Sequence, residues 1–246
     1  MTMQLPIKTM TRFDWSGVAV ALERGRLVAL PSDTVYGIAC KPGPAALARL
    51  FAAKGRAAEK PVALVFPDAQ QIFYDFPPLP APVTNAVEAL LPGPVTLVLP
   101  FPEADEPGAM AETGRERSGE HVMEPAGTKP PGGAAQAAIA CVASGGGVGV
   151  RALPQPAAAL FERLPSPLAL TSANLAGGPD PCSAEEIPEE IRQACEYVLD
   201  AGPIEGCAPS TVVDLRPLAA GRPAVILREG AMDIDEIARE IGRPGA

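Results

Sequence analysis

The sequence predicts an α/β fold, because short apolar segments typical of buried strands alternate along the chain with segments of helical periodicity. Hydrophobic residues form 47% of the 246 residues, which is enough for a core of ordinary size in one large domain or two small ones. Thirty prolines and 24 glycines indicate many turns between these elements.

The first half of the chain predicts three helices and four strands. The first helix begins at Asp14, a candidate N-cap, and ends at Gly25. The second starts at a proline suited to a first helical turn, carries Leu47 and Leu50 on one face, and stops at Gly55. The third helix is expected at 82–93, and the strands at 26–31, 38–40, 61–66 and 94–100.

The second half begins with a segment of different character. Residues 102–133 have almost no aliphatic side chains and are rich in proline, glycine and charge, which predicts a mobile loop. The helices expected after it are 134–143, 155–164, 183–195 and 233–241. The strands are expected within 145–151, 167–174, 210–215 and 224–230.

Charge and cysteine usage limit the class of protein. A net charge of -9 and a pI near 4.8 argue against nucleic-acid binding by the whole surface and are compatible with a local basic cleft. No apolar run approaches about 18 residues, so neither a transmembrane helix nor a membrane partner is expected. The five cysteines form no CxxC pair and are interpreted as buried free thiols in a reducing compartment. We therefore expect a cytoplasmic enzyme or binding protein.

Several common catalytic arrangements are missing. The single histidine, His121, lies in the predicted mobile loop, which argues against a Ser-His-Asp or Cys-His unit and against a His/Cys metal site. The glycine-rich stretch 144–150 lacks the Lys and Ser/Thr of a P-loop, so it is interpreted as a flexible approach to a strand. No protein-bound metal is expected.

Three cations gather within seven residues of this acidic chain. Lys54, Arg56 and Lys60 fall at and after the end of the second predicted helix. A solvated helix end is one interpretation, because cations favour the negative end of the helix dipole by a few tenths of a kcal/mol. An anion site is the other, since arginine offers a planar fork to phosphate oxygens and lysine a movable point charge.

Polar residues beside the predicted strands are further candidates. Open α/β sheets commonly bind ligands at strand ends, although each of these residues also fits a hydrogen-bonded turn or a satisfied edge charge. They are Thr34 and Tyr36 in PSDTVYG, Ser172 and Asn174 in TSAN, Ser210 in PSTVVD, Arg151 after VGV, and Arg228 after VIL.

The order of these motifs along the chain is more specific than any one of them. PSDTVYG, KGRAAEKP, LPGPVTLVLP, VGVR, LTSANLAG, PSTVVD and VILREG follow one another between about Gly17 and Gly230, interrupted by 102–133. This series resembles the YrdC-like threonylcarbamoyl-AMP synthase family in its short, single-domain form. The signature of that family, Lys-x-Arg followed much later by Ser-x-Asn, is matched by Lys54-Gly55-Arg56 and Ser172-Ala173-Asn174.

The resemblance implies a fold and a domain organisation. The expected architecture is a YrdC-like α/β sandwich around a twisted mixed sheet with a central, positively charged cavity. Residues 10–232 would form the YrdC-like domain, with a mobile insertion at 102–133. Residues 233–246 would form a C-terminal helix and tail.

The resemblance also implies an activity. Members of the family condense L-threonine, bicarbonate and ATP, which enters with Mg²⁺, to threonylcarbamoyl-AMP and pyrophosphate. The product supplies the threonylcarbamoyl group of the modified tRNA nucleoside t6A. Expected partners are these substrates and a tRNA threonylcarbamoyl-transferase complex that receives the product. Double-stranded RNA binding, with tRNA as the candidate, is a further property of the family.

Site residues carry over by position. The resemblance implies Lys54 and Arg56 as catalytic residues and Tyr36 as a pocket wall. The implied ATP contacts are Arg56, Lys60, Asn174, Ser183 and Arg228, and the implied threonine contacts are Thr34, Arg151, Ser172 and Ser210. Two departures from the pattern affect these sites. Cys182 stands where Thr or Ser is usual, with Ser183 as a substitute contact, and the histidine common after the VGVR segment is missing.

Two rival functions come from other classes. A nucleotide- or RNA-binding relative without synthetic activity is one, and the intact Lys-x-Arg and Ser-x-Asn pairs argue against it. A carbamoyl-transfer module of hydrogenase-maturation proteins is the other. Such modules lie in much longer chains with zinc-finger cysteines, which this sequence lacks.

Overall fold

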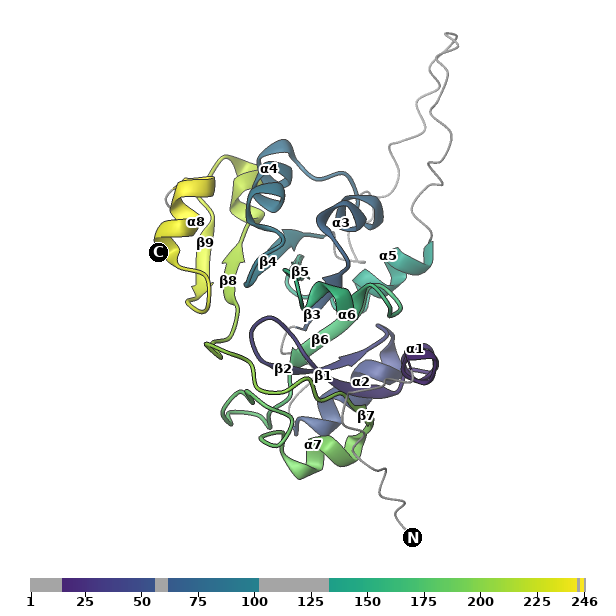
Figure 1. Ribbon diagram of the computed structural model, residues 1–246. Helices are drawn as coiled ribbons and strands as arrows, with labels where there is room; N and C mark the ends of the chain where they lie inside the picture. Colours follow the sequence, from purple (N-terminus) through teal and green to yellow (C-terminus); the bar gives the residue numbers. More distant parts are fainter. Residues whose placement is uncertain (1–14, 56–61, 102–132, 243, 246) are drawn as a thin grey trace.

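The fold is a nine-stranded mixed sheet with helices packed on it, seen in a computed structural model that describes residues 15–55, 62–101, 133–242, 244 and 245 (Figure 1). The strands are β1 (Leu27–Pro31), β2 (Tyr36–Cys40), β3 (Ala63–Phe66), β4 (Val95–Pro100), β5 (Gly147–Ala152), β6 (Leu168–Ser172), β7 (Cys195–Val198), β8 (Thr211–Asp214) and β9 (Val225–Arg228). Their order across the sheet is β7-β1-β2-β6-β3-β5-β4-β8-β9. The α/β sandwich with a mixed sheet that the sequence predicts is confirmed.

The helices connect these strands and follow the predicted order. They are α1 (Trp15–Glu23), α2 (Pro44–Ala53), α3 (Ala69–Asp75), α4 (Ala81–Leu90), α5 (Gly133–Ala140), α6 (Ala158–Phe161), α7 (Glu189–Ala194) and α8 (Ile234–Ile241), with a 3₁₀ helix η1 (Arg216–Ala220). Gly25 follows α1 with a φ of +68° and Gly55 follows α2 with a φ of +59°, the left-handed conformation that commonly ends helices.

The sheet mixes both kinds of strand pairing. The pairs β1–β7, β3–β5 and β4–β8 are parallel, whereas β1–β2, β2–β6, β3–β6, β4–β5 and β8–β9 are antiparallel. The central strands come from distant parts of the chain, since β6 lies between β2 and β3. The turn after β1 contacts Arg151 of β5, and the segment after β8 contacts the turn before β5.

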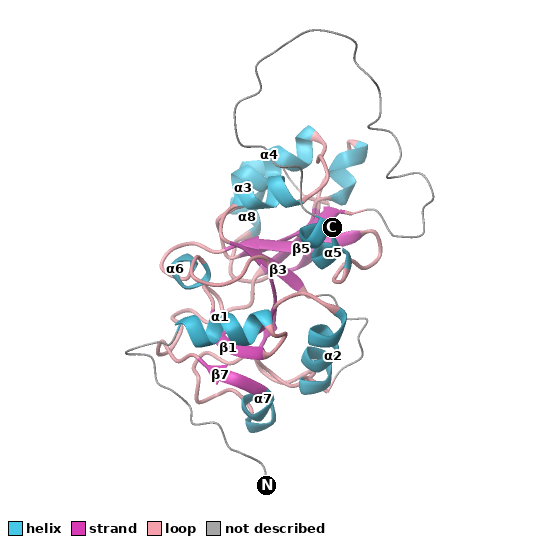
Figure 2. Ribbon diagram, turned by 90° about the vertical axis from the view of Figure 1, so that its right-hand side faces the viewer, coloured by secondary structure: helices cyan, strands magenta, loops and turns pink. Residues whose placement is uncertain are grey.

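Alternating side chains divide the core between the two faces of the sheet. In β1, Leu27 and Ala29 join one buried cluster, and Val28 and Leu30 join the other. The larger cluster includes residues of α2, α4, α7 and α8, and the smaller one includes residues of α1 and α6. Figure 2 shows α1 and α2 on opposite sides of β1. Both faces of the sheet therefore carry helices.

Some predicted elements are shorter in the structure. The helix predicted at 183–195 is formed only as α7, because Pro188 has no amide proton to donate and stands at the N-cap. The helix predicted at 155–164 is formed only as α6, preceded by Pro154 and Pro156. The predictions for both helices were therefore too long.

Besides the short 3₁₀ helix η1, two elements were not predicted. The helix α3 begins after Asp68, whose side chain accepts a hydrogen bond from the amide of Gln71 at 2.8 Å. That capping pattern was present in the sequence. The strand β7 is only four residues long and pairs with β1 alone, so its sequence carries little signal.

The cysteines correct the expectation of free thiols. Cys182 and Cys207 form a disulfide, and Cys141 is exposed. Only Cys40 and Cys195 are buried free thiols among the described residues, and burial raises the pKa of each to about 12. The thiol interpretation was wrong for the disulfide pair, because the fold brings together two loops whose proximity no local pattern encodes.

The end of the chain packs on the main core. Ile237 of α8 is completely buried in the larger cluster, which also contains α4. The boundaries 10–232 and 233–246 stay predictions, and residues 102–132 of the predicted insertion lie outside the described residues. None of the described helices has the length and hydrophobicity needed to span a bilayer.

Candidate active site

A cavity of about 320 Å³ opens on the sheet face opposite the larger core cluster. Strand β5 shows how alternation forms it. Gly147, Gly149 and Arg151 line the cavity, and Val148 and Val150 between them point into the core. The other strands that line it are β2, β3, β4, β6, β8 and β9. Residues from both halves of the chain therefore share one site.

Small residues form the floor of the cavity. A Cβ added at Gly37 would lie 2.6 Å from Cδ1 of Leu170, and one at Gly149 would lie 3.3 Å from Cγ2 of Thr96. Neither glycine has a positive φ, so the missing side chain, rather than the backbone conformation, is what matters there. The glycines of the β2 and β5 motifs leave room for a ligand above the sheet.

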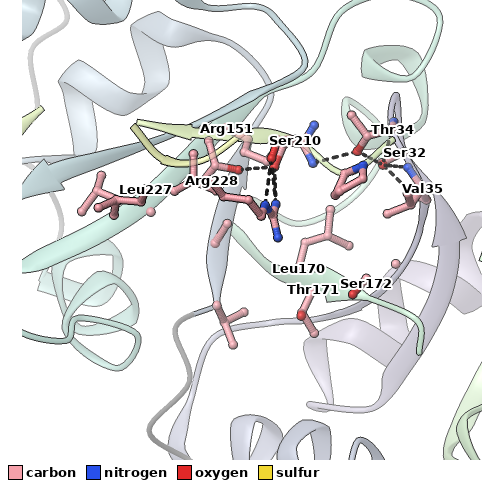
Figure 3. A pocket seen from close by; sticks show the side chains of 18 of the residues that line it. Ser32, Thr34, Val35, Arg151, Leu170, Thr171, Ser172, Ser210, Leu227 and Arg228 are labelled. Atoms are coloured by element: carbon pink, nitrogen blue, oxygen red, sulfur yellow. Dashed lines mark hydrogen bonds between the residues drawn. The ribbon is translucent and has the colours of Figure 1, made fainter. Parts of the chain in front are cut away.

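Arg151 crosses the cavity toward the turn between β1 and β2. One terminal nitrogen of its guanidinium lies 2.5 Å from Oδ1 of Asp33. The other donates to Oγ1 of Thr34 at 3.3 Å (Figure 3). Nε of Arg151 and Oδ2 of Asp33 are buried and have no hydrogen-bond partner among the described residues. Burial raises the pKa of Asp33 despite the adjacent guanidinium, and burial, aided by the charge of Arg228, lowers the pKa of Arg151.

The turn that receives Arg151 is fixed by its own hydroxyls. Oγ of Ser32 donates to the carbonyl of Val35 at 2.7 Å and lies 3.1 Å from Oγ1 of Thr34. The amides of Thr34 and Val35 both donate to Oγ of Ser32 at 3.2 Å. This network holds the Thr34 hydroxyl at the cavity wall.

A second hydroxyl cluster lies at the start of β8. Oγ of Ser210 lies 2.7 Å from Oγ1 of Thr96 and accepts a hydrogen bond from Arg228 at 3.2 Å. Arg228 also donates to the carbonyl of Ser210 from two nitrogens, at 2.8 and 3.2 Å (Figure 3). Among the described residues no carboxylate lies within 4.0 Å of Arg228. Its charge is available to an anion in the cavity.

Lys54 joins the two halves of the predicted signature. Its side chain is almost completely buried, and its ammonium donates to the carbonyl of Ser172 and, at 2.7 Å, to Oδ1 of Asn174. Oγ of Ser172 donates to the same Oδ1 at 2.8 Å. The amide nitrogen of Asn174 donates to the carbonyl of Gly178 and to the Asp180 carboxylate, at 2.7 and 3.0 Å. Lys54 is thus placed to hold the Ser-x-Asn segment.

The structure brings several predicted site residues together. Those that line the cavity are Thr34, Arg151, Ser172, Ser210 and Arg228. Lys54 and Asn174 are absent from that lining and lie in the network behind Ser172. Ser183 is also absent from the lining, next to the Cys182 disulfide. Arg56 and Lys60 lie outside the described residues.

Tyr36 does not form the pocket wall that the resemblance implied. It is completely buried, and its hydroxyl donates to the carbonyl of Gly202 at 2.7 Å and accepts from the amide of Ala201 at 3.1 Å. Its side chain faces the core because Gly37, the next residue, faces the cavity. Tyr36 fixes the segment after β7 instead of contacting a ligand.

Sequence reasoning missed other polar residues of the cavity. They are Ser32, Thr96, Ser144, Thr171, Asp180 and Arg216. Ser32 is part of the PSDTVYG motif and Arg216 follows STVVDL directly, so proximity to those motifs was the available signal. Within the described residues, no three His, Cys, Asp or Glu side chains gather in a way that could hold a metal ion.

Comparison with known families identifies the arrangement. The sequence model of the Sua5/YciO/YrdC family, described as "Telomere recombination", matches residues 20–118 and 134–230. A threonylcarbamoyl-AMP synthase of Alkalilimnicola ehrlichii is 30% identical over 214 residues, which are 85% of this chain and 94% of that protein. A threonylcarbamoyl-AMP synthase of Pyrococcus abyssi is 29% identical over 226 residues, 90% of this chain. The chain spans only 55% of the length of that archaeal relative.

A solved structure agrees with these matches. The crystal structure of P. abyssi Sua5 complexed with L-threonine superposes with a TM-score of 0.71 at 27% identity, covering 97% of this chain and 62% of that one. Together with the family match to both sides of residues 119–133, this similarity covers the sheet and the cavity. The chain belongs to the Sua5/YciO/YrdC family.

Proposed function

We propose that this chain is an L-threonylcarbamoyladenylate synthase, a nucleotidyltransferase that converts L-threonine, bicarbonate and ATP into threonylcarbamoyl-AMP and pyrophosphate. The observation that carries the proposal is the cavity in which Arg151, Arg228 and the hydroxyls of Thr34, Ser172 and Ser210 converge. Family membership and relatives named threonylcarbamoyl-AMP synthase support it.

The reaction suits a site built from cations and hydroxyls. The amine of threonine and bicarbonate combine to a carbamate with loss of water. A carbamate oxygen then attacks the α-phosphorus of ATP, and the bond to the β-phosphate oxygen breaks, so that pyrophosphate leaves with the electron pair. Both reactants are anions, and the protein's task is to hold them together and offset their repulsion. No side-chain nucleophile is required.

The residues of the cavity divide this task. Arg151, held by Asp33 and Thr34, faces the anionic end of threonine or of its carbamate, and the hydroxyls of Ser172 and Ser210 complete that contact. Arg228, Asn174, Arg56 and Lys60 contact the nucleotide. Lys54 acts by holding Ser172 and Asn174 in place.

The partners and the location follow from the same proposal. Mg²⁺ enters with ATP as part of the substrate, and a tRNA threonylcarbamoyl-transferase complex accepts the product. Direct tRNA binding, through double-stranded regions, belongs to the same proposal. The cytoplasm is the expected compartment.

Because that compartment keeps most thiols reduced, thiol trapping in freshly lysed cells measures how much of the Cys182–Cys207 bond persists there.

Turnover of the purified protein tests the proposed reaction. With MgATP, bicarbonate and threonine, we expect pyrophosphate release that stops when any one of them is omitted, and threonylcarbamoyl-AMP in the mass spectrum.

Arg151→Lys keeps the charge but loses the guanidinium fork, so kcat/KM for threonine should fall at least about tenfold, or roughly 1.4 kcal/mol. The exposed Arg24→Lys is the matched control.

The possible outcomes separate the rival functions. Pyrophosphate release that does not depend on threonine contradicts synthesis of threonylcarbamoyl-AMP. Tight ATP binding without any product favours the non-catalytic nucleotide-binding alternative.

A further inference from the structure

Arg216 is a third arginine in the cavity wall, and no sequence motif assigned it a role. It stands at the start of η1, and only Leu215 separates it from the end of β8. Its Nε donates to Oδ1 of Asp214 at 2.9 Å, and a terminal nitrogen donates to Oδ2 at 2.7 Å. This two-point contact with Asp214 fixes the plane of the guanidinium.

A tight turn on β5 fixes the other side of Arg216. Ser144 and Gly147 exchange backbone hydrogen bonds at 2.9 and 3.2 Å, with Gly145 and Gly146 between them at φ of +56° and +71°. Two positive φ values in a two-residue loop are typical of a type I′ hairpin turn. The second terminal nitrogen of Arg216 donates to the carbonyl of Gly145. The glycine-rich stretch is therefore an ordered turn and not the flexible approach that the sequence predicted.

These contacts leave part of the guanidinium unused. An arginine side chain has five N–H donors, and the contacts to Asp214 and Gly145 use three of them. Two donors remain on the terminal nitrogens of a side chain that is 35% exposed and lines the cavity. The neighbouring Ser144 adds an exposed hydroxyl to the same wall.

The position of Arg216 is at the far end of the cavity from Arg151. A Cβ added at Gly147 would lie 3.0 Å from Cδ of Arg216, so the arginine lies over the first residue of β5. Arg151 stands near the other end of that strand, about 13 Å away along it. A ligand that reaches from one to the other must be long and must carry acceptor oxygens at both ends.

We propose that Arg216, together with the Ser144 hydroxyl, binds the phosphate chain of a nucleoside triphosphate at the end remote from Arg151. The inference rests on the proposed function, because that function places the threonine-derived anion at Arg151 and ATP in the remaining cavity. Two fixed N–H donors match the oxygens of a β- or γ-phosphate. Asp214 keeps the fork oriented before the ligand arrives, so little side-chain entropy is lost on binding.

Binding measurements with the whole chain test the assignment. Arg216→Gln should raise the Kd for ATP and for inorganic pyrophosphate at least about fivefold in calorimetric titrations, with the Kd for AMP and threonine unchanged. Ser144→Ala should shift the same two ligands by a smaller factor. Arg222→Gln is the matched control, because it removes an exposed arginine just after η1 and outside the cavity lining.

Each alternative gives a different pattern. Equal losses for ATP and AMP would place Arg216 at the nucleoside and overturn the assignment. If Arg216→Gln lowers the thermal stability and weakens the binding of every ligand in parallel, Arg216 only holds the 144–147 turn in place. Arg216→Lys, which retains the charge, tests this alternative. Ligand affinities of Arg216→Gln equal to those of the Arg222→Gln control would also overturn the assignment. If the wild type binds ATP but makes no product, the proposed synthase function fails. The binding comparison between Arg216→Gln and Arg222→Gln still tests the role of Arg216 in that case.

Discussion

At the scale of single residues, the cations of the site differ in how far their charge is already engaged. Asp33 pairs with Arg151 and Asp214 pairs with Arg216, whereas among the described residues Arg228 contacts only carbonyl and hydroxyl oxygens. A paired arginine keeps its direction and part of its donors, but it attracts an anion less strongly. Orientation is therefore supplied by the pairs, and net positive charge by the unpaired Arg228.

Lys54 tests whether a buried cation can act through its neighbours. Lys54→Met retains the apolar stem and removes the donor to Ser172 and Asn174, so the rate of the proposed synthase reaction should fall at least about tenfold. The KM for ATP should rise with it, because Asn174 loses its support. Lys41→Met, which removes an exposed lysine paired with Glu23, is the control. Wild-type rates for Lys54→Met would show that this lysine is only an ordinary charged residue at the end of a helix.

Asp214 makes a prediction about acid stability. Burial opposes its ionisation, but hydrogen bonds and the charge of Arg216 hold the pKa of Asp214 below its ordinary value of 3.8. A lowered folded-state pKa adds stability that is present above about pH 4 and is lost as the pH falls through the folded-state value. In urea unfolding between pH 5 and pH 2, Asp214→Asn should therefore lose less free energy of unfolding than the wild type. An identical pH dependence would show that the pair contributes nothing.

At the scale of elements, the two-residue period of β5 builds the site. The same strand supplies Val148 and Val150 to the core and Gly147, Gly149 and Arg151 to the cavity. The alternation was visible in GVGVR, and the strand was predicted from it. Which face would be open was not visible, because it depends on the helices that cover the larger cluster and on the turn that folds over the other face.

Gly149 is the residue at which this floor can be filled. Gly149→Val adds a branched side chain where even a Cβ would lie 3.3 Å from Thr96, and β-branched residues favour strands. We expect a folded protein with a melting temperature within a few degrees of the wild type and at least tenfold weaker ligand binding. Gly149→Ala should give a smaller loss of affinity. A full loss of structure in both variants would show that the glycine serves packing rather than the ligand.

At the scale of the whole molecule, the sheet order makes one site from distant segments. The strand order places β6 between β2 and β3, so that Lys54 and Ser172 meet although they are 118 residues apart. The disulfide joins two further cavity segments, because Cys182 follows Asp180 closely and Cys207 precedes Ser210. Loops on both sides of β7 are thereby tied together.

The disulfide should stabilise the molecule through the unfolded chain. Cysteines 25 residues apart close a loop whose lost unfolded-state entropy corresponds to about 3.5 kcal/mol. Reduction, or the Cys182→Ser/Cys207→Ser double variant, should lower the free energy of unfolding by roughly that amount. Cys141→Ser, at an exposed free thiol, should not. Equal unfolding curves for oxidised and reduced protein would mean that the bond does not form in solution.

The sequence by itself determined the periodic elements and the motif series. Helical and two-residue patterns gave most helices and strands, and the ordered motifs indicated a family, its fold and the residues Thr34, Arg151, Ser172, Ser210 and Arg228 that meet in the cavity. Only the tertiary structure decided the strand order, the disulfide, the core position of Tyr36, the location of Lys54 behind the wall, and Arg216 in it. Local sequence fixes hydrogen bonds and faces within a few residues, whereas these features are contacts across the sheet, set by how the apolar faces pack together.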